Sequence, residues 1–203
     1  SKKLAQNGFV AVSAEYRLSL EALYPAAVYD LKACIRWMKT NADKFGIDTN
    51  HIAVLGCSAG GQLASLLGTT NHKTAFEDTI DYQYVSSTVH AVVNIDGTLA
   101  FKHPESTGGP VYWLGGDYEQ AKDKWEAAAP LNHIDKNTVP FIFLNSSIPR
   151  FHAGRDDAIK IMDSIHIYTE VHTFQDTPHP FWFFNPWFEP MMEKILLFLR
   201  QKL

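Results

Sequence analysis

The chain has 203 residues, of which 46% are hydrophobic and 20% are charged, and its formal net charge is −4. This composition predicts one soluble domain with a sizeable core, and it leaves no basic stripe for a nucleic acid. No apolar run approaches the roughly 20 residues of a membrane helix, so neither nucleic acid nor membrane is expected as a partner. The two cysteines, Cys34 and Cys57, are too few to indicate a disulfide framework, and they do not determine the cellular compartment.

Strand and helix signals alternate from the N-terminus onward. Residues 8–18 follow a glycine with β-branched and apolar side chains, which predicts a strand. Residues 24–46 then place apolar side chains three and four apart, with Pro25 suited to a first helical turn and Gly46 to a helix end. Further strands are predicted at 51–56, 89–96, 140–146 and 169–175, and further helices at 61–68, 119–127, 157–165 and 190–202.

These elements predict an α/β fold over residues 1–203 as a single domain. Nearly continuous apolar strands joined through helices are typical of a mostly parallel sheet with both faces covered. The glycine- and proline-rich residues 102–116 read as a long surface excursion.

A crowded turn follows the predicted strand 51–56. Gly56-Cys57-Ser58-Ala59-Gly60 has the arrangement G-x-S-x-G between a strand and a helix, which is the context of a nucleophile elbow. Neighbours without a Cβ let the backbone fold close around the serine, and the helix N-terminus behind it favours developing negative charge. Ser58 is therefore the candidate nucleophile.

A serine hydroxyl needs an adjacent base and an acid that orients the base. In this fold the histidine follows the last strand, and His179 lies four residues beyond Gln175, where that strand is predicted to end. We therefore predict His179 as the base. The other histidines considered precede the last strand or fall in or beside regular elements, where packing or solvation explains them: His133, His152, His166 and His172.

Several segments resemble one family. Residues 14–64, together with 113–116, 127–134, 146–157 and 176–182, look like the α/β-hydrolase superfamily, in its hormone-sensitive-lipase-like branch. They are most similar to the esterases that remove acetyl or feruloyl groups from plant polysaccharides. The resemblance covers nearly the whole chain, and it implies a serine esterase acting on a carbohydrate-linked ester.

The position of the acid departs from the pattern of this family. In most relatives an aspartate comes a few residues after the strand that corresponds to 140–146, but residues 147–150 carry no carboxylate here. Asp156 is the favoured candidate, although an aspartate at this place also suits a helix N-cap. Asp157 and Asp96 are the alternatives.

The upstream part of the family pattern is also missing. Relatives carry a strand and a His-Gly-Gly loop whose backbone N–H joins that of the residue after the nucleophile, here Ala59, in binding the oxyanion. The absent strand would lie between 8–18 and 51–56, so we expect an N-terminally incomplete α/β-hydrolase fold. An upstream segment or another chain is then expected to complete the sheet, because buried unpaired backbone groups are costly.

The expected chemistry is acyl transfer from a small ester or an acylated carbohydrate, with no metal and no organic cofactor. Aromatic faces suit sugar or feruloyl rings, and Trp182 and Trp113 are the candidate substrate contacts, with core packing as the alternative. Arg17 and Asp30 are predicted to form a local ion pair. A serine peptidase of the same fold and a non-catalytic homologue remain the alternative functions.

Overall fold

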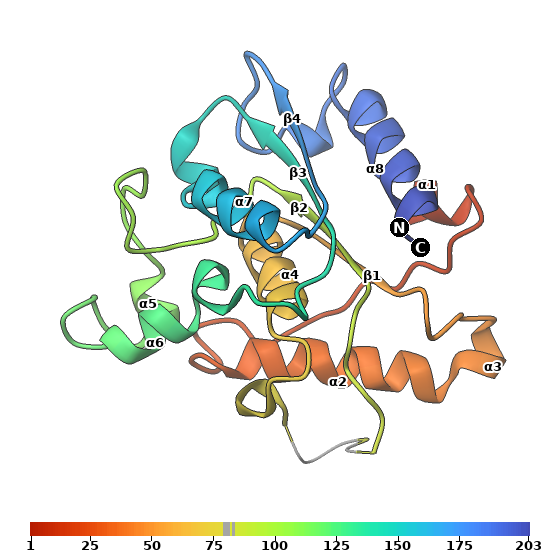
Figure 1. Ribbon diagram of the computed structural model, residues 1–203, viewed down its shortest axis with the longest axis horizontal. Coiled ribbons are helices and arrows are strands. Elements are labelled where there is room, and N and C mark those ends of the chain that lie inside the picture. Colours follow the sequence, from red (N-terminus) through yellow and green to blue (C-terminus); the bar gives the residue numbers. More distant parts are fainter. Residues whose placement is uncertain (79–81, 83) are drawn as a thin grey trace.

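A four-stranded parallel sheet lies at the centre of the computed structural model, which describes residues 1–203 except 79–81 and 83 (Figure 1). The strand order is β1-β2-β3-β4, so each strand pairs with its neighbour in the chain. The strands are β1 (Ala53–Cys57), β2 (Ala91–Ile95), β3 (Phe141–Ser146) and β4 (Thr169–Phe174). The predicted parallel α/β architecture is confirmed, and all residues of β2 and β3 are buried.

Helices cover both faces of the sheet. One apolar cluster joins the sheet to α2, α4 and α7, and a second cluster joins its other face to α8, as Figure 1 shows. The α-helices are α1 (Lys2–Ala5), α2 (Ala26–Thr40), α3 (Ala42–Phe45), α4 (Ala59–Thr69), α5 (Val111–Leu114), α6 (Lys122–Ala127), α7 (Arg155–Ser164) and α8 (Phe188–Lys202). Short 3₁₀ turns are η1 (Thr74–Phe76), η2 (Pro130–His133), η3 (Pro149–His152) and η4 (Phe181–Phe183).

The predicted helix from 24 to 46 is divided in two. Pro25 caps α2 rather than lying in its first turn, and Asn41 separates α2 from α3. Gly46 follows α3 with φ 66°, the left-handed conformation that a helix-ending glycine adopts readily. The ion pair between Arg17 and Asp30 is present, with 2.8 Å between nitrogen and oxygen.

The predicted strand at 8–18 is wrong for this structure. Residues 9–18 have no assigned strand, and Val10 and Val12 are 48% and 42% exposed. A strand needs a neighbour for its backbone groups. The outer edge of β1 does not supply one, because a groove of about 550 Å³ separates it from residues 8–14. Among the described residues, β1 is therefore a sheet edge, and Leu55 on it is 41% exposed.

The excursion at 102–116 is confirmed as a loop that contains only the single-turn helix α5. Its Trp113 and the following Trp125 build a small apolar cluster beside Phe101. Among the helices of the described residues, none is long and apolar enough to cross a bilayer.

Candidate active site

Ser58 occupies a tight turn between β1 and α4. Its backbone has φ 54° and ψ −120°, a conformation that residues other than glycine rarely adopt. The turn requires glycine at 56, because a Cβ there would lie 1.9 Å from the carbonyl oxygen of Gly60. The structure therefore shows the strand-turn-helix geometry that the G-x-S-x-G pattern predicts.

Asp96 lies beside Ser58 on the neighbouring strand. Cys57 of β1 is in register with Ile95 of β2, so Ser58 and Asp96 each follow the last paired residue of their strands. The Ser58 N–H donates to the Ile95 carbonyl at 2.8 Å, which extends the strand ladder to the serine itself. Both side chains therefore emerge at the same carboxyl edge of the sheet.

Buried hydrogen bonds hold the turn that carries Asp96. The side-chain oxygen of Asn94 accepts from the Gly97 N–H at 2.7 Å, and its amide nitrogen donates to Ser65 Oγ at 2.7 Å. These bonds support Asp96 at φ 48°. Gly97 lies so close to α4 that a Cβ on it would be 2.3 Å from the carbonyl carbon of Gly61. This close contact fixes the turn after β2 against the helix that follows the serine.

His179 connects the two strand ends. It follows β4, as predicted, and it precedes η4. Its Nε2 lies 2.9 Å from Ser58 Oγ. Its Nδ1 lies 3.0 Å from Asp96 Oδ2. With Nδ1–H donating to the carboxylate, Nε2 is left free to accept the serine proton. Asp96 is only 1% exposed, so its carboxylate is shielded from water, whereas the His179 side chain is 21% exposed.

The favoured acid, Asp156, is not beside His179, and that prediction is corrected. Asp156 is exposed and accepts hydrogen bonds from Arg155 at the start of α7. The alternative Asp157 is paired with His103 and Lys160. The carboxylate that contacts His179 is that of Asp96, because the sheet register brings the end of β2 next to Ser58.

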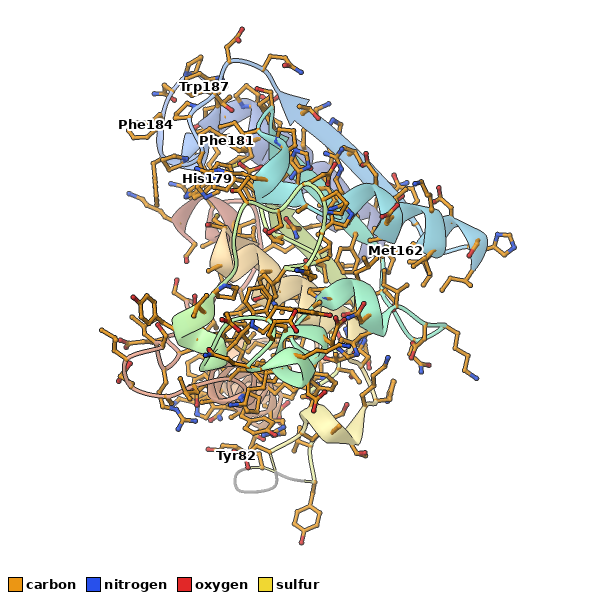
Figure 2. The ribbon with its side chains drawn as sticks, turned by 90° about the vertical axis from the view of Figure 1, so that its left-hand side faces the viewer. Tyr82, Met162, His179, Phe181, Phe184 and Trp187 are labelled. Carbon is orange, nitrogen blue, oxygen red and sulfur yellow. The ribbon has the colours of Figure 1, made fainter. Side chains whose placement is uncertain are left out.

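Aromatic rings surround the His179 imidazole. Phe151 of η3 stacks on it, with ring centroids 3.5 Å apart and planes inclined by 12°. Trp182 approaches it edge-on at 5.1 Å. Arg150 lies on the ring of Phe151, with its guanidinium carbon 4.4 Å from the centroid. Figure 2 places His179 at the same end of the molecule as Phe181, Phe184 and Trp187. The rings restrict rotation of the imidazole.

Ala59 is the first residue of α4, and the first N–H groups of a helix have no partner within it. Its N–H therefore lies where the sequence predicts an oxyanion donor. The adjacent Cys57 is a poor nucleophile, because burial and, secondarily, the charge of Asp96 raise the pKa of its thiol to about 12. Ser58, unlike Cys57, has its side-chain oxygen within hydrogen-bond reach of a base, His179.

The other candidates lie apart from this hydrogen-bonded row. Trp113 packs against Tyr24 and Phe101, so its contacts are those of a core residue. The Nε2–H of His133 donates to the Ala127 carbonyl at 2.8 Å, away from Ser58. Within the part of the chain that the structure describes, no group of three histidine, cysteine or carboxylate side chains is arranged to hold a metal ion.

Three residues at the site were missed from the sequence: Asn94, Asn145 and Phe151. The two asparagines interrupt fully buried apolar strands near their carboxyl ends, a signal that a buried polar side chain has a defined partner. Phe151 lies in η3, in the segment after β3 that lacks the carboxylate of the family pattern. No sequence pattern points to its stacking on His179.

Comparisons with known proteins agree with this geometry. The family model described as BD-FAE matches residues 1–171. Esterase LipC of Mycobacterium tuberculosis is 31% identical over 152 residues, covering 71% of this chain and 38% of LipC. The probable carboxylic ester hydrolase LipM of the same organism is 27% identical over 163 residues, covering 77% of this chain and 36% of LipM. The chain thus spans little more than a third of these relatives.

Solved structures show the same fold. A truncated carbohydrate esterase from gut microbiota superimposes with a TM-score of 0.84 at 24% identity, over 98% of this chain and 76% of that one. A thermophilic esterase of Thermogutta terrifontis gives a TM-score of 0.79 at 23% identity, over 98% of this chain and 73% of that one. The architecture is therefore that of the α/β-hydrolase esterases, and the chain belongs to the BD-FAE family.

Proposed function

We propose that this chain hydrolyses carboxylic esters by acyl transfer through Ser58, His179 and Asp96. The observation that carries the proposal is the unbroken hydrogen-bonded row from Asp96 through His179 to Ser58, with distances of 3.0 and 2.9 Å. A nucleophile, a base in hydrogen-bond reach and a buried orienting carboxylate form the arrangement that activates a serine. The named esterases among the relatives support the same chemistry.

In the proposed reaction, His179 Nε2 takes the proton of Ser58 while Oγ attacks the ester carbonyl. The Ala59 N–H, at the N-terminus of α4, binds the oxyanion that forms. The imidazolium then gives its proton to the leaving alkoxide, and an acyl-enzyme remains. His179 next removes a proton from water, whose oxygen attacks the acyl carbonyl. The imidazolium then returns this proton to Ser58 Oγ as the acyl–Oγ bond breaks and the acid leaves. Asp96 holds the imidazole and stabilises its positive charge throughout.

For the substrate, we propose acetyl or feruloyl esters of plant polysaccharides such as xylan. Trp182 packs against His179 with ring planes inclined by 88°, and Phe183 beside it is 74% exposed. Exposed aromatic faces next to the base suit a sugar or a feruloyl ring. The carbohydrate esterases among the similar structures support this class. Trp113 remains a less favoured contact because it packs in the core.

The first test is Ser58→Ala with p-nitrophenyl acetate. We expect the burst of p-nitrophenol and the steady turnover both to disappear, because Ser58 carries the hydroxyl that His179 contacts and burial keeps the neighbouring Cys57 thiol protonated. Labelling by a fluorophosphonate should likewise require Ser58. Turnover retained in Ser58→Ala would remove the serine from the mechanism.

A second test separates the substrate classes. We expect the wild-type chain to release acetate from acetylated xylan and to leave dipeptide anilides intact. The reverse preference would indicate a serine peptidase of the same fold. A chain that neither turns over an ester nor reacts with a fluorophosphonate would be a non-catalytic homologue, and the proposed function would fail.

We further propose that an additional extended segment lies in the groove beside β1 and completes the sheet. The groove is lined mostly by apolar residues, and Ala53, Val54 and Leu55 of β1 are among them. A strand there would also be placed to supply a second oxyanion N–H near Ala59. Hydrogen exchange of the β1 amides in the protein purified from its own source tests this. Protection equal to that of β2 supports the added strand, and fast exchange at β1 opposes it.

A further inference from the structure

We infer that Arg155 is a positioning residue for the catalytic base, acting through Asn145 on Asp96. The inference rests on the proposed ester hydrolysis and adds to it a second row of hydrogen bonds behind the carboxylate. This row begins at the first residue of α7 and ends at the buried carboxylate that orients His179.

The carboxylate of Asp96 has a different environment at each oxygen. Oδ2 accepts from His179, whereas Oδ1 accepts from the backbone N–H of Ser146 at 2.8 Å. The side-chain amide of Asn145 also donates to Oδ1, over a longer 3.4 Å. Asn145 and Ser146 are fully buried, so these donors replace water around the carboxylate. These two donors orient the Asp96 carboxylate.

Arg155 fixes which end of the Asn145 amide faces Asp96. Its Nη1 donates to Asn145 Oδ1 at 2.9 Å. A guanidinium carries only donors, so it holds the amide oxygen on its own side and turns the NH₂ toward the carboxylate. A flipped amide would bring its oxygen against Asp96, which disfavours the carboxylate position that His179 needs. The orientation of Asp96 thus depends on Arg155.

Asp156 also binds the Arg155 guanidinium. Its Oδ1 accepts from Arg155 Nε at 2.8 Å and lies 2.8 Å from Nη2. The Arg155 side chain is only 13% exposed, so this paired contact holds a guanidinium that is mostly shielded from water. The aspartate that the sequence favoured as the catalytic acid is therefore connected to the triad, through Arg155 and Asn145.

The test compares steady-state kinetics of the full chain on p-nitrophenyl acetate. We expect Arg155→Met to lower kcat about tenfold, the scale of one lost orienting hydrogen bond, with KM unchanged because Arg155 does not touch the ester. Arg155→Lys retains a charge and a donor but not the planar fork, and it should recover part of kcat. Arg200→Met, which removes an exposed arginine from α8, is the matched control and should match wild type.

A double-mutant cycle keeps the inference testable if one variant folds poorly. Asn145→Ala should lower kcat by a similar factor, and adding Arg155→Met to it should cost nothing more, because both act through one amide. Additive losses would overturn the inference. So would a kcat for Arg155→Met equal to that of Arg200→Met.

A proton NMR measurement does not require turnover. The downfield resonance of the His179 Nδ1 proton, which reports its bond to Asp96, should shift or broaden in Arg155→Met and stay in place in Arg200→Met. An unchanged resonance overturns the inference even if the chain proves inactive on every ester. Conversely, a wild-type chain that is unlabelled by fluorophosphonate overturns the proposed function while the resonance still tests the row behind Asp96.

Discussion

Strands β1 and β2 are matched in length and in their first residues, yet their surroundings differ completely. Each has five residues, begins with Ala-Val and delivers a site residue directly after its end, Ser58 or Asp96. All of β2 is buried, whereas β1 pairs along one edge only among the described residues and has an exposed Leu55. The comparison shows that a strand can place a reactive side chain accurately while only one of its edges is paired, because the shared edge sets the register.

The largest expected effect comes from the residue at the end of β2. Asp96→Asn should lower kcat about 10⁴-fold, the scale known for such a change in a serine protease triad, because the amide disturbs the His179 tautomer. Asp156→Asn should lower it less than about threefold, since Asp156 reaches the triad only through Arg155. Ester turnover and thermal melting of both variants measure this contrast. Equal losses would return Asp156 to the role of the catalytic acid.

The glycine after Asp96 gives the next largest effect. Gly97→Ala would place a Cβ 2.3 Å from backbone of α4, so the helix must shift, at about 3 kcal/mol of unfolding free energy. Gly60→Ala is the control, because its Cβ meets nothing within 4 Å, and it should stabilise α4 by about 0.5 to 1 kcal/mol. Urea denaturation distinguishes the two. A stable Gly97→Ala would contradict the close contact between the β2 turn and α4.

Leu55 and Val93 test the two strands directly, since they are register partners. Val93→Ala empties a fully buried site and should cost about 2 kcal/mol, whereas Leu55→Ala should cost under about 1 kcal/mol although it removes more atoms. Equal costs in the 203-residue chain would mean that its own residues cover the outer edge of β1, and the proposed added strand would lose its place. The same pair of denaturation curves therefore also tests the groove.

The smallest effect is a dependence of stability on pH. Burial, the largest cause for each, lowers the pKa of His90, His133 and His152 below their ordinary value of 6.5. The unfolded chain therefore binds more protons than the folded chain, and the free energy of unfolding falls as pH decreases through 6.5. We expect a lower Tm at pH 5.5 than at pH 7.5, and a smaller difference in His133→Gln. The exposed His51→Gln is the control, and a Tm that rises on acidification would contradict the burial of these rings.

The sequence predicts the strands that pair with their neighbours in the chain. Residues 51–56, 140–146 and 169–175 were placed to within a few residues because each is a short apolar run beside a helix of the right period. Residues 8–18 have the same character but no paired neighbour in the structure, so their pattern alone did not decide their conformation.

The residues of the site that a local sequence pattern specifies could be predicted. The acid could not, because its position depends on the register between strands. The glycines around Ser58 and the place of His179 after the last strand are readable in the sequence. The choice among Asp96, Asp156 and Asp157 is not, since it depends on which strand end lies beside Ser58. The asparagine inside each buried strand was the available signal, because Asn94 and Asn145 both serve the turn that carries Asp96.

The ladder between β1 and β2 has a consequence for sequence variation on this fold. Adjacent strands lie about 4.8 Å apart, so the distance between the roots of Ser58 and Asp96 is a property of backbone pairing and not of any loop. Insertions after β3 can then change the residues around His179 without moving Ser58 relative to Asp96. A one-residue slip of β1 against β2 would separate them while leaving every loop intact.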